Sequence, residues 1–161
     1  MPAPVYFTTQ ASPLGDLTLC MTGGRLCGLY FEGHKPAPKH EGWIRDDGPL
    51  FDAARTWLDA YFTGKKPRKR LPVDFRSGTS FQRRVWDTLI SIPYGETTSY
   101  AAIAVEIGSP RAVRAVGAAV GRNPLSIFIP CHRVIGRDGT LTGYAGGIDR
   151  KKHLLALEAQ K

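Results

Sequence analysis

Hydrophobic positions in the N-terminal part of the chain follow first a strand-like and then a helix-like period. Three short segments rich in β-forming residues, separated by turns with Pro or Gly, predict an antiparallel β-meander: Val5 to Thr9, Leu17 to Thr22 and Leu26 to Phe31. Proline, glycine and mixed charges then predict a loop from His34 to Gly48. Apolar residues next recur at helical spacing from Leu50 to Tyr61, and Gly64 ends this predicted helix.

The pattern in the rest of the chain is mainly helical. Thr79 or Ser80 can cap a helix with a single apolar stripe, which is formed by Phe81, Val85, Trp86, Leu89 and Ile90. Thr98 or Ser99 begins a second, short helix that runs from Tyr100 to Ile107. A β-rich apolar run from Ser126 to Ile129 follows later and predicts a strand.

A third helix is predicted from Pro110 to about Gly121, with Ser109 as its N-cap. Together with the short helix before it, it forms a predicted helix-turn-helix. Its residues are nearly all small or basic: Arg111, Ala112, Arg114, Ala115, Gly117 and the following Arg122. Small residues suit either tight packing against another helix or close approach to DNA. The arginines favour DNA, because cationic side chains neutralise phosphates.

The composition agrees with a basic globular protein. The 161 residues include 22 Lys and Arg against 14 Asp and Glu, a net charge of +8, which favours a polyanionic partner. We place a boundary near residue 75, between an α/β subdomain at 1–75 and a mainly α subdomain at 76–161. The densest basic run, Lys65 to Arg70, lies just before this boundary. We interpret it as a solvated linker in preference to a nucleic-acid patch, because it has no interleaved aromatic residues.

The cysteines and the N-terminus indicate a cellular setting. Cys20, Cys27 and Cys131 cannot form a complete disulfide framework, which favours a reducing environment. Met1 to Gln10 has no basic segment followed by an apolar run, and no apolar run approaches the ~18 residues that span a bilayer. We therefore expect a cytoplasmic protein without a membrane partner.

Cys131 is the strongest candidate for chemistry. Pro130 precedes it, and His132 and Arg133 follow it. Nearby positive charge favours the thiolate, which is the nucleophilic form of cysteine. Cys20 and Cys27 lie in apolar β segments without such neighbours, and we interpret them as packing residues.

Several strings around Cys131 resemble one family, the O6-alkylguanine-DNA alkyltransferases, also called methylated-DNA-protein-cysteine methyltransferases. They are Ser12-Pro13-Leu14-Gly15, Pro93-Tyr94-Gly95-Glu96-Thr97, Ser99-Tyr100, Arg122-Asn123-Pro124, Pro130-Cys131-His132-Arg133-Val134 and Gly143-Tyr144-Ala145-Gly146-Gly147. The resemblance extends over essentially the whole chain. It implies a ribonuclease H-like α/β subdomain, an antiparallel sheet with a helix, followed by the mainly α subdomain with its helix-turn-helix.

The resemblance also implies a reaction and roles for its residues. The protein would flip an alkylated guanine out of duplex DNA and move the alkyl group from O6 to Cys131, once per molecule; O4 of thymine would be a further substrate. His132 would act through a water as the base, and Glu158 would orient His132. Asn123 would support the active-site turns, and the Tyr100 hydroxyl would donate to the guanine ring.

Binding roles follow from the same motif positions. The resemblance implies a substrate pocket formed by Tyr100, Ser126, Val134, Tyr144 and Ala145. It implies a DNA-binding surface formed by Arg111, Ala112, Arg114, Ala115, Gly117, Arg122 and Arg133, with Arg114 inserted into the base stack. The expected partner is double-stranded DNA containing O6-alkylguanine, bound by a monomer that can act cooperatively.

No cofactor is implied, and no metal is expected, because Cys20, Cys27, His34 and His40 do not reproduce the zinc-binding set of some relatives. The main alternative is a non-enzymatic alkylated-DNA-binding protein, against which the presence of Cys131 argues. A cysteine hydrolase would need a histidine from a distant segment. A basic transcription factor would leave the segment from Pro130 to Val134 without a purpose.

Overall fold

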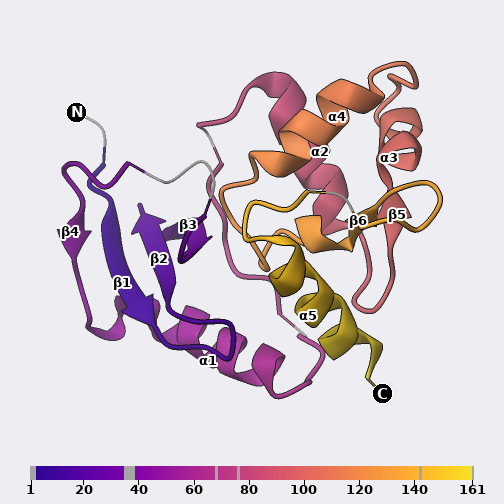
Figure 1. The fold of residues 1–161 in the computed structure, drawn as a ribbon. Helices are drawn as coiled ribbons and strands as arrows, with labels where there is room; N and C mark the ends of the chain where they lie inside the picture. The colour runs from indigo at the N-terminus through magenta and orange to yellow at the C-terminus, as the bar shows by residue number, and fades with distance from the viewer. Residues whose placement is uncertain (1–2, 35–38, 68, 76, 142, 161) are drawn as a thin grey trace.

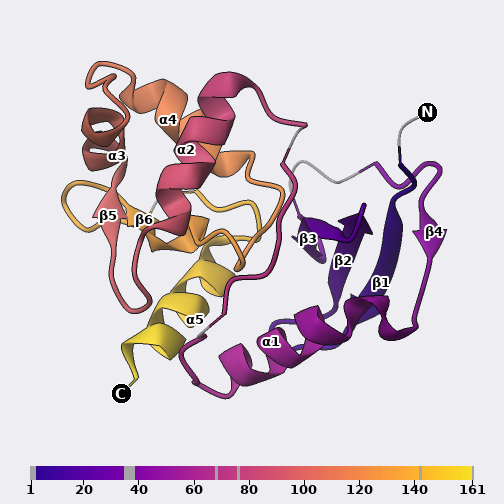
Figure 2. The same cartoon turned by 180° about the vertical axis from the view of Figure 1, so that it is seen from behind.

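The computed structural model describes residues 3–34, 39–67, 69–75, 77–141 and 143–160. A sheet and one helix form the N-terminal part, and the remaining helices gather beside it (Figure 1). The view from behind shows the connecting segment between α1 and α2 running where the two parts meet (Figure 2). None of the helices in the described ranges is long and apolar enough to cross a membrane.

Four strands form the N-terminal sheet in the order β3-β2-β1-β4: β1 (Tyr6–Gln10), β2 (Leu17–Thr22), β3 (Arg25–Phe31) and β4 (Ile44–Arg45). The predicted antiparallel meander β1-β2-β3 is confirmed. Gly23 and Gly24 both have positive φ, as a two-residue hairpin turn requires. The sheet is mixed because β4, in the segment predicted as a loop, pairs parallel to β1.

The helix α1 (Asp52–Phe62) follows a short 3-10 turn, Pro49–Phe51, and confirms the predicted N-terminal helix. Its Ala54, Leu58 and Tyr61 are buried in the same core as the apolar residues of the sheet. Arg55 also donates to the hydroxyl of Thr8 on β1 at 2.7 Å. Lys65, Lys66, Lys69 and Arg70 of the basic run are exposed, and its Arg68 lies outside the described residues.

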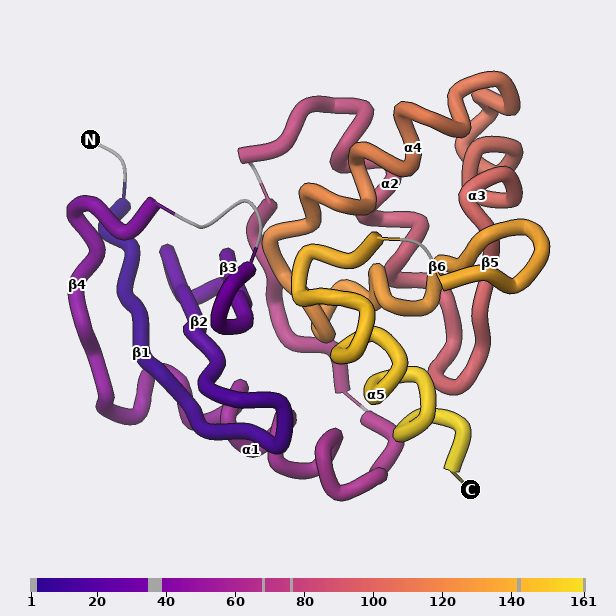
Figure 3. Tube along the Cα trace, in the orientation of Figure 1, coloured from indigo at the N-terminus to yellow at the C-terminus, as the bar shows by residue number. Residues whose placement is uncertain are grey.

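The outer edge of β3 is covered by two segments from elsewhere in the chain. Leu26 bridges to Val73 of the connecting segment, and Leu29 bridges to Leu125, which follows α4. The amide of Leu29 donates to the carbonyl of Pro124 at 2.9 Å. The Cα trace shows the segment that follows α4 passing beside β3 (Figure 3). The chain that leads to Cys131 is therefore attached to the N-terminal sheet.

In the described residues, the C-terminal part consists of four helices: α2 (Ser80–Ile90), α3 (Tyr100–Glu106), α4 (Val113–Gly121) and α5 (Ile148–Ala159). Thr79 caps α2 in a reciprocal pair with Gln82, and Ser99 caps α3. The helices α3 and α4 form the helix-turn-helix. The predicted start of α4 at Pro110 is wrong, because Ser109 accepts a turn hydrogen bond from the amide of Ala112 at 2.8 Å, and the helix begins only at Val113.

The predicted strand from Ser126 to Ile129 is also wrong, because these residues form a tight turn. The Asn123 side chain closes the turn by donating to the carbonyl of Ile129 and accepting from the amide of Leu125, each at 2.9 Å. Ile127 adopts a φ of 72°, a region that a β-branched residue rarely occupies. Two buried hydrogen bonds to one side chain therefore override the β propensity of the run.

Candidate active site

Cys131 begins a short 3-10 turn, Cys131–Arg133, directly after the turn that Asn123 closes. The chain then enters β6 (Val134–Ile135), which pairs parallel with β5 (Thr98–Ser99). Cys131 is only 4% exposed, and His132 is fully buried. Strands on one side and the Asn123 turn on the other thus fix the backbone of the candidate nucleophile and its neighbour.

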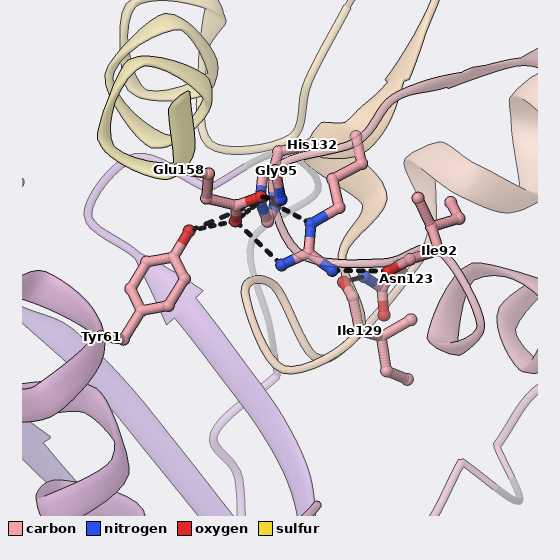
Figure 4. Close-up of polar contacts among 8 residues, drawn as sticks. Tyr61, Ile92, Gly95, Asn123, Ile129, His132 and Glu158 are labelled. Atoms are coloured by element: carbon pink, nitrogen blue, oxygen red, sulfur yellow. Dashed lines mark hydrogen bonds and ion pairs between the residues drawn. The ribbon is translucent and has the colours of Figure 1, made fainter. Parts of the chain in front are cut away.

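Glu158, near the end of α5, is the centre of a buried polar network (Figure 4). Its Oε2 lies 2.6 Å from His132 Nε2 and accepts from the Tyr61 hydroxyl at 2.6 Å. Arg133 donates to both carboxylate oxygens, at 2.7 and 3.0 Å, and to the carbonyl of Ile92 at 2.7 Å. We call Tyr61, His132, Arg133 and Glu158 the carboxylate cluster.

This cluster keeps Glu158 ionised. Burial alone would raise the pKa of its carboxyl, but the hydrogen bonds from His132, Arg133 and Tyr61 lower the pKa to about 2. Burial lowers the pKa of His132, against the opposing effect of Glu158. A neutral imidazole beside a carboxylate carries its proton on Nε2, which leaves the lone pair on Nδ1. Nδ1 has no hydrogen-bond partner among the described residues and is available as a base.

The thiol lies in a second group of side chains, which we call the thiol cluster: Cys131, Asn123, Ser126, Tyr144 and Lys151. Burial raises the pKa of Cys131, and Asn123 and the charge of Lys151 act in the opposite direction. The Tyr144 hydroxyl lies near both Cys131 and Ser126, but neither hydroxyl completes a hydrogen bond within the described part of the chain. The thiol is therefore protonated at rest and needs a base to become a nucleophile.

Lys151 is a member of the thiol cluster that sequence reasoning missed. It is 1% exposed, and its Nζ donates to the carbonyl of Val134 at 2.6 Å. The sequence prediction assigned the positive charge beside the thiol to His132 and Arg133. The structure instead commits Arg133 to Glu158 and the carbonyl of Ile92. A lysine on an amphipathic helix usually faces solvent, so nothing in the sequence marked it.

A cavity of about 850 Å³ lies next to this site, between α4, the end of β3 and the segment before α5. Its lining includes five predicted site residues: Tyr100, Arg114, Gly117, Tyr144 and Ala145. Glu32 and Arg150 also line it, and the sequence analysis did not predict either of them. Tyr144 therefore borders the cavity and also lies near the Cys131 thiol.

The predicted DNA-contacting residues divide into two groups. Arg111, Arg114, Ala115 and Arg122 are exposed along α4 and its two ends, and Ala112 and Gly117 are half-buried on the same helix. Arg133 does not belong with them: it is 8% exposed and hydrogen-bonded within the carboxylate cluster. The neighbouring carboxylate takes up its charge in the interior, so the position of Arg133 does not support its predicted role in DNA binding.

No group of three or more His, Cys, Asp and Glu side chains that could hold a metal occurs in the described ranges. Cys20 is a buried free thiol and Cys27 a half-buried one, and burial raises the pKa of both. Neither lies in the thiol or the carboxylate cluster.

Comparison with known proteins identifies the family of this chain. Residues 5–75 match a family model described as the ribonuclease-like domain of 6-O-methylguanine DNA methyltransferase, and residues 80–160 match its DNA binding domain. The chain belongs to the 6-O-methylguanine DNA methyltransferase family. It is therefore an alkyltransferase of DNA repair.

Relatives of known name agree with this assignment. A methylated-DNA–protein-cysteine methyltransferase of Mycobacterium bovis is 48% identical over 98% of this chain and 94% of its own length. One from Methanosarcina barkeri is 48% identical over 96% of this chain and 97% of its own. The crystal structure of Mycobacterium tuberculosis OGT in complex with DNA superposes with a TM-score of 0.90 at 48% identity, over 96% of this chain and 92% of that one.

Proposed function

We propose that this methyltransferase moves an alkyl group from O6 of guanine in double-stranded DNA to the Sγ of Cys131, in a single irreversible turnover. The observation that carries the proposal is a buried thiol next to a histidine whose Nε2 is held by Glu158 at 2.6 Å. This is the arrangement of an activated nucleophile, with a base that a third group orients. The mycobacterial relative crystallised with DNA supports DNA as the partner.

The reaction has a simple balance of bonds and charge. His132 Nδ1 takes the thiol proton through a water, and Glu158 remains ionised and stabilises the imidazolium. The thiolate attacks the alkyl carbon, so that the S–C bond forms as the C–O6 bond breaks. The electron pair of that bond stays on the purine, to which the Tyr100 hydroxyl donates a hydrogen bond. The thioether is not hydrolysed, so each molecule acts once.

Substrate recognition is assigned to the cavity between α4 and the segment before α5. Tyr144 and the amide of Ala145 line it, and Ser126 lies behind Tyr144. The carbonyl of Val134 already accepts from Lys151, and its second lone pair is available for the guanine amino group. The same pocket would accept O4-alkylthymine.

We assign DNA binding to α4, placed in the minor groove. Ala115 and Gly117 allow its close approach, and the exposed Arg111 and Arg122 reach phosphates. Arg114 lines the cavity and is exposed, so it can replace the flipped base in the stack. Unstacking costs a few kcal/mol, which the inserted guanidinium partly offsets.

Other features of the proposal follow from the family. We propose a division into subdomains at 1–75 and 76–161, action as a monomer that can assemble cooperatively on DNA, a cytoplasmic location, and no cofactor, because the thiol is itself the acceptor. The alternative, a protein that binds alkylated DNA without repairing it, leaves the buried base beside Cys131 without a purpose.

The test is incubation with a duplex containing O6-methylguanine, followed by peptide mapping. We expect one added methyl on the peptide with Cys131, none on Cys20 or Cys27, and no more than one equivalent transferred. Cys131→Ala should bind the duplex without transfer. Repeated turnover, or wild-type binding without transfer, would overturn the proposal.

The role of Arg114 has its own test. Arg114→Ala should repair slowly and keep most of its affinity for undamaged DNA. Arg25→Ala removes the same charge from the exposed start of β3 and is the matched control. Equal repair rates for the two variants would contradict the assigned role.

A further inference from the structure

Tyr61 is the one residue of the carboxylate cluster that comes from the N-terminal part of the chain. It lies on α1, is fully buried, and stacks on Trp57 with ring centroids 5.5 Å apart and an interplanar angle of 7°. Its hydroxyl points away from α1 and donates to Glu158 Oε2 at 2.6 Å (Figure 4). A tyrosine on an apolar helical stripe is expected to serve only the core. Here its hydroxyl reaches the catalytic carboxylate.

Tyr61 and His132 use the same oxygen. Glu158 Oε2 receives the Tyr61 hydroxyl and lies 2.6 Å from His132 Nε2, and the hydroxyl is 3.5 Å from that nitrogen. Arg133 and the more distant amide of Gly95 hold the other oxygen, at 2.7 and 3.3 Å. Arg133 also donates to Oε2 through its Nη2, at 3.0 Å. The phenol and the guanidinium therefore both hold the oxygen that the imidazole contacts, which restricts the direction of the Glu158–His132 contact.

Tyr61 can act only as a donor. Burial raises the pKa of its phenol, and the nearby Glu158 raises it further, so the hydroxyl keeps its proton. Its hydrogen bond is one of the contacts that lower the pKa of Glu158. A less basic carboxylate stabilises an imidazolium less, so the effect of Tyr61 extends to His132.

We propose that Tyr61 is a positioning residue of the alkyl-transfer site, which sets the orientation and basicity of Glu158 and, through it, the proton affinity of His132. The α/β subdomain then contributes directly to activation of the thiol on the other subdomain. This inference rests on the proposed function, in which His132 is the base.

The sign of the expected pH effect follows from the groups that face His132. These groups are Glu158 and Lys151 of α5, the adjacent Arg133, and Tyr61 of α1. Removing the Tyr61 hydroxyl leaves more negative charge on Oε2, which stabilises the imidazolium and raises the pKa of His132. The acidic limb of the rate profile must then move to higher pH, because a protonated Nδ1 cannot accept the thiol proton.

The primary test compares Tyr61→Phe with Tyr94→Phe. The Tyr94 ring lies 6.2 Å from that of Tyr61, and its hydroxyl has no hydrogen-bond partner in the described ranges, so the control deletes the same atom near the same cluster. Two readouts are followed against pH: single-turnover methyl transfer, and alkylation of Cys131 by iodoacetamide, which needs no DNA.

For Tyr61→Phe we expect transfer at neutral pH to slow about tenfold, and the acidic limb of both readouts to rise by about one pH unit. Tyr94→Phe should match the wild type. A slower Tyr61→Phe with an unmoved limb would mean a purely structural role and overturn the inference, as would wild-type behaviour.

A second variant covers the case in which Tyr61→Phe fails to fold. Incorporation of 3,5-difluorotyrosine at position 61 keeps the ring and makes the phenol a stronger donor. The acidic limb should then move to lower pH, and an unmoved limb would overturn the inference. Wild-type protein that transfers no methyl would refute the proposed function, whereas an unmoved limb beside normal wild-type transfer refutes only the role of Tyr61.

Discussion

The carboxylate cluster and the thiol cluster are adjacent in the chain but differ in how their polar groups are satisfied. In the carboxylate cluster, both oxygens of Glu158 accept hydrogen bonds, and Arg133 also reaches the carbonyl of Ile92. Near the thiol, the hydroxyls of Ser126 and Tyr144 complete no hydrogen bond in the described ranges. Unsatisfied buried groups are costly, so natural proteins keep few of them. In the proposed mechanism, the carboxylate cluster would hold the base, and the thiol cluster would keep hydrogen-bonding capacity for the substrate.

The largest expected effect comes from breaking the carboxylate cluster. Glu158→Ala leaves the Arg133 guanidinium and the Tyr61 hydroxyl buried without their acceptor, which should lower the free energy of unfolding by roughly 3–5 kcal/mol. Urea denaturation measures this change. Glu106→Ala, at the exposed end of α3, should change stability by less than about 0.5 kcal/mol. Equal effects would mean that the network contributes no stability.

The next effect is on the pH dependence of stability. Glu158 has a folded-state pKa of about 2, below its ordinary value of 4.5, so its contribution is present above about pH 4.5 and is lost as pH falls toward 2. The full loss should amount to about 3 kcal/mol, of which about 2 kcal/mol is reached at pH 3. Urea denaturation at pH 7, 4 and 3 measures it for the wild type and for Glu158→Gln. Parallel pH profiles for the two proteins would contradict the prediction.

A smaller effect is expected from the charge in the thiol cluster. Lys151 opposes the burial that raises the pKa of Cys131, so Lys151→Met should raise that pKa further. The midpoint of iodoacetamide alkylation against pH measures the change. Lys152→Met, at the next and exposed position, is the control. If both variants and the wild type share one alkylation midpoint, Lys151 does not contribute to activation of the thiol.

The smallest effect on stability is expected at the Tyr144 hydroxyl. Tyr144→Phe removes a buried hydroxyl that has no hydrogen-bond partner among the described residues, and should change the free energy of unfolding by less than about 0.5 kcal/mol. Tyr61→Phe removes a hydrogen bond to a charged group and should cost roughly 1.5–3 kcal/mol. Thermal unfolding of the pair tests the difference between the two clusters directly, since both variants lose the same atom.

Local signals in the sequence predicted most of the fold. The meander follows from β-forming segments separated by turn residues, and the start of α2 follows from Thr79 as a helix cap before an apolar stripe. The segment from Ser126 to Ile129 could not be predicted this way. Its β propensity is real, but the Asn123 side chain supplies the hydrogen bonds that a neighbouring strand would otherwise provide. The two-residue strand β4 is too short to show the alternation of apolar and polar residues that marks a strand.

The residues of the candidate site could be predicted only where a sequence motif indicates them. Cys131 was predicted from its neighbours in the sequence, and the roles of His132 and Glu158 were predicted by resemblance; the structure brings the last two within 2.6 Å. Tyr61 and Lys151 were missed for a physical reason. A buried phenol or ammonium is tolerated because of partners elsewhere in the chain, Glu158 for Tyr61 and the carbonyl of Val134 for Lys151. Neither partner is visible in the local pattern of its own helix.

The covered edge of β3 has a consequence for how the molecule resists aggregation and unfolds. An uncovered edge strand is a template for pairing with another chain, but Leu26 and Leu29 already bond to the carbonyls of Pro72 and Pro124. Exposing this edge requires release of the connecting segment and of the segment that leads to Cys131. Loss of the reactive centre and exposure of an aggregation-prone strand are then one cooperative event, which amide hydrogen exchange at Leu26 and Leu29 would register together.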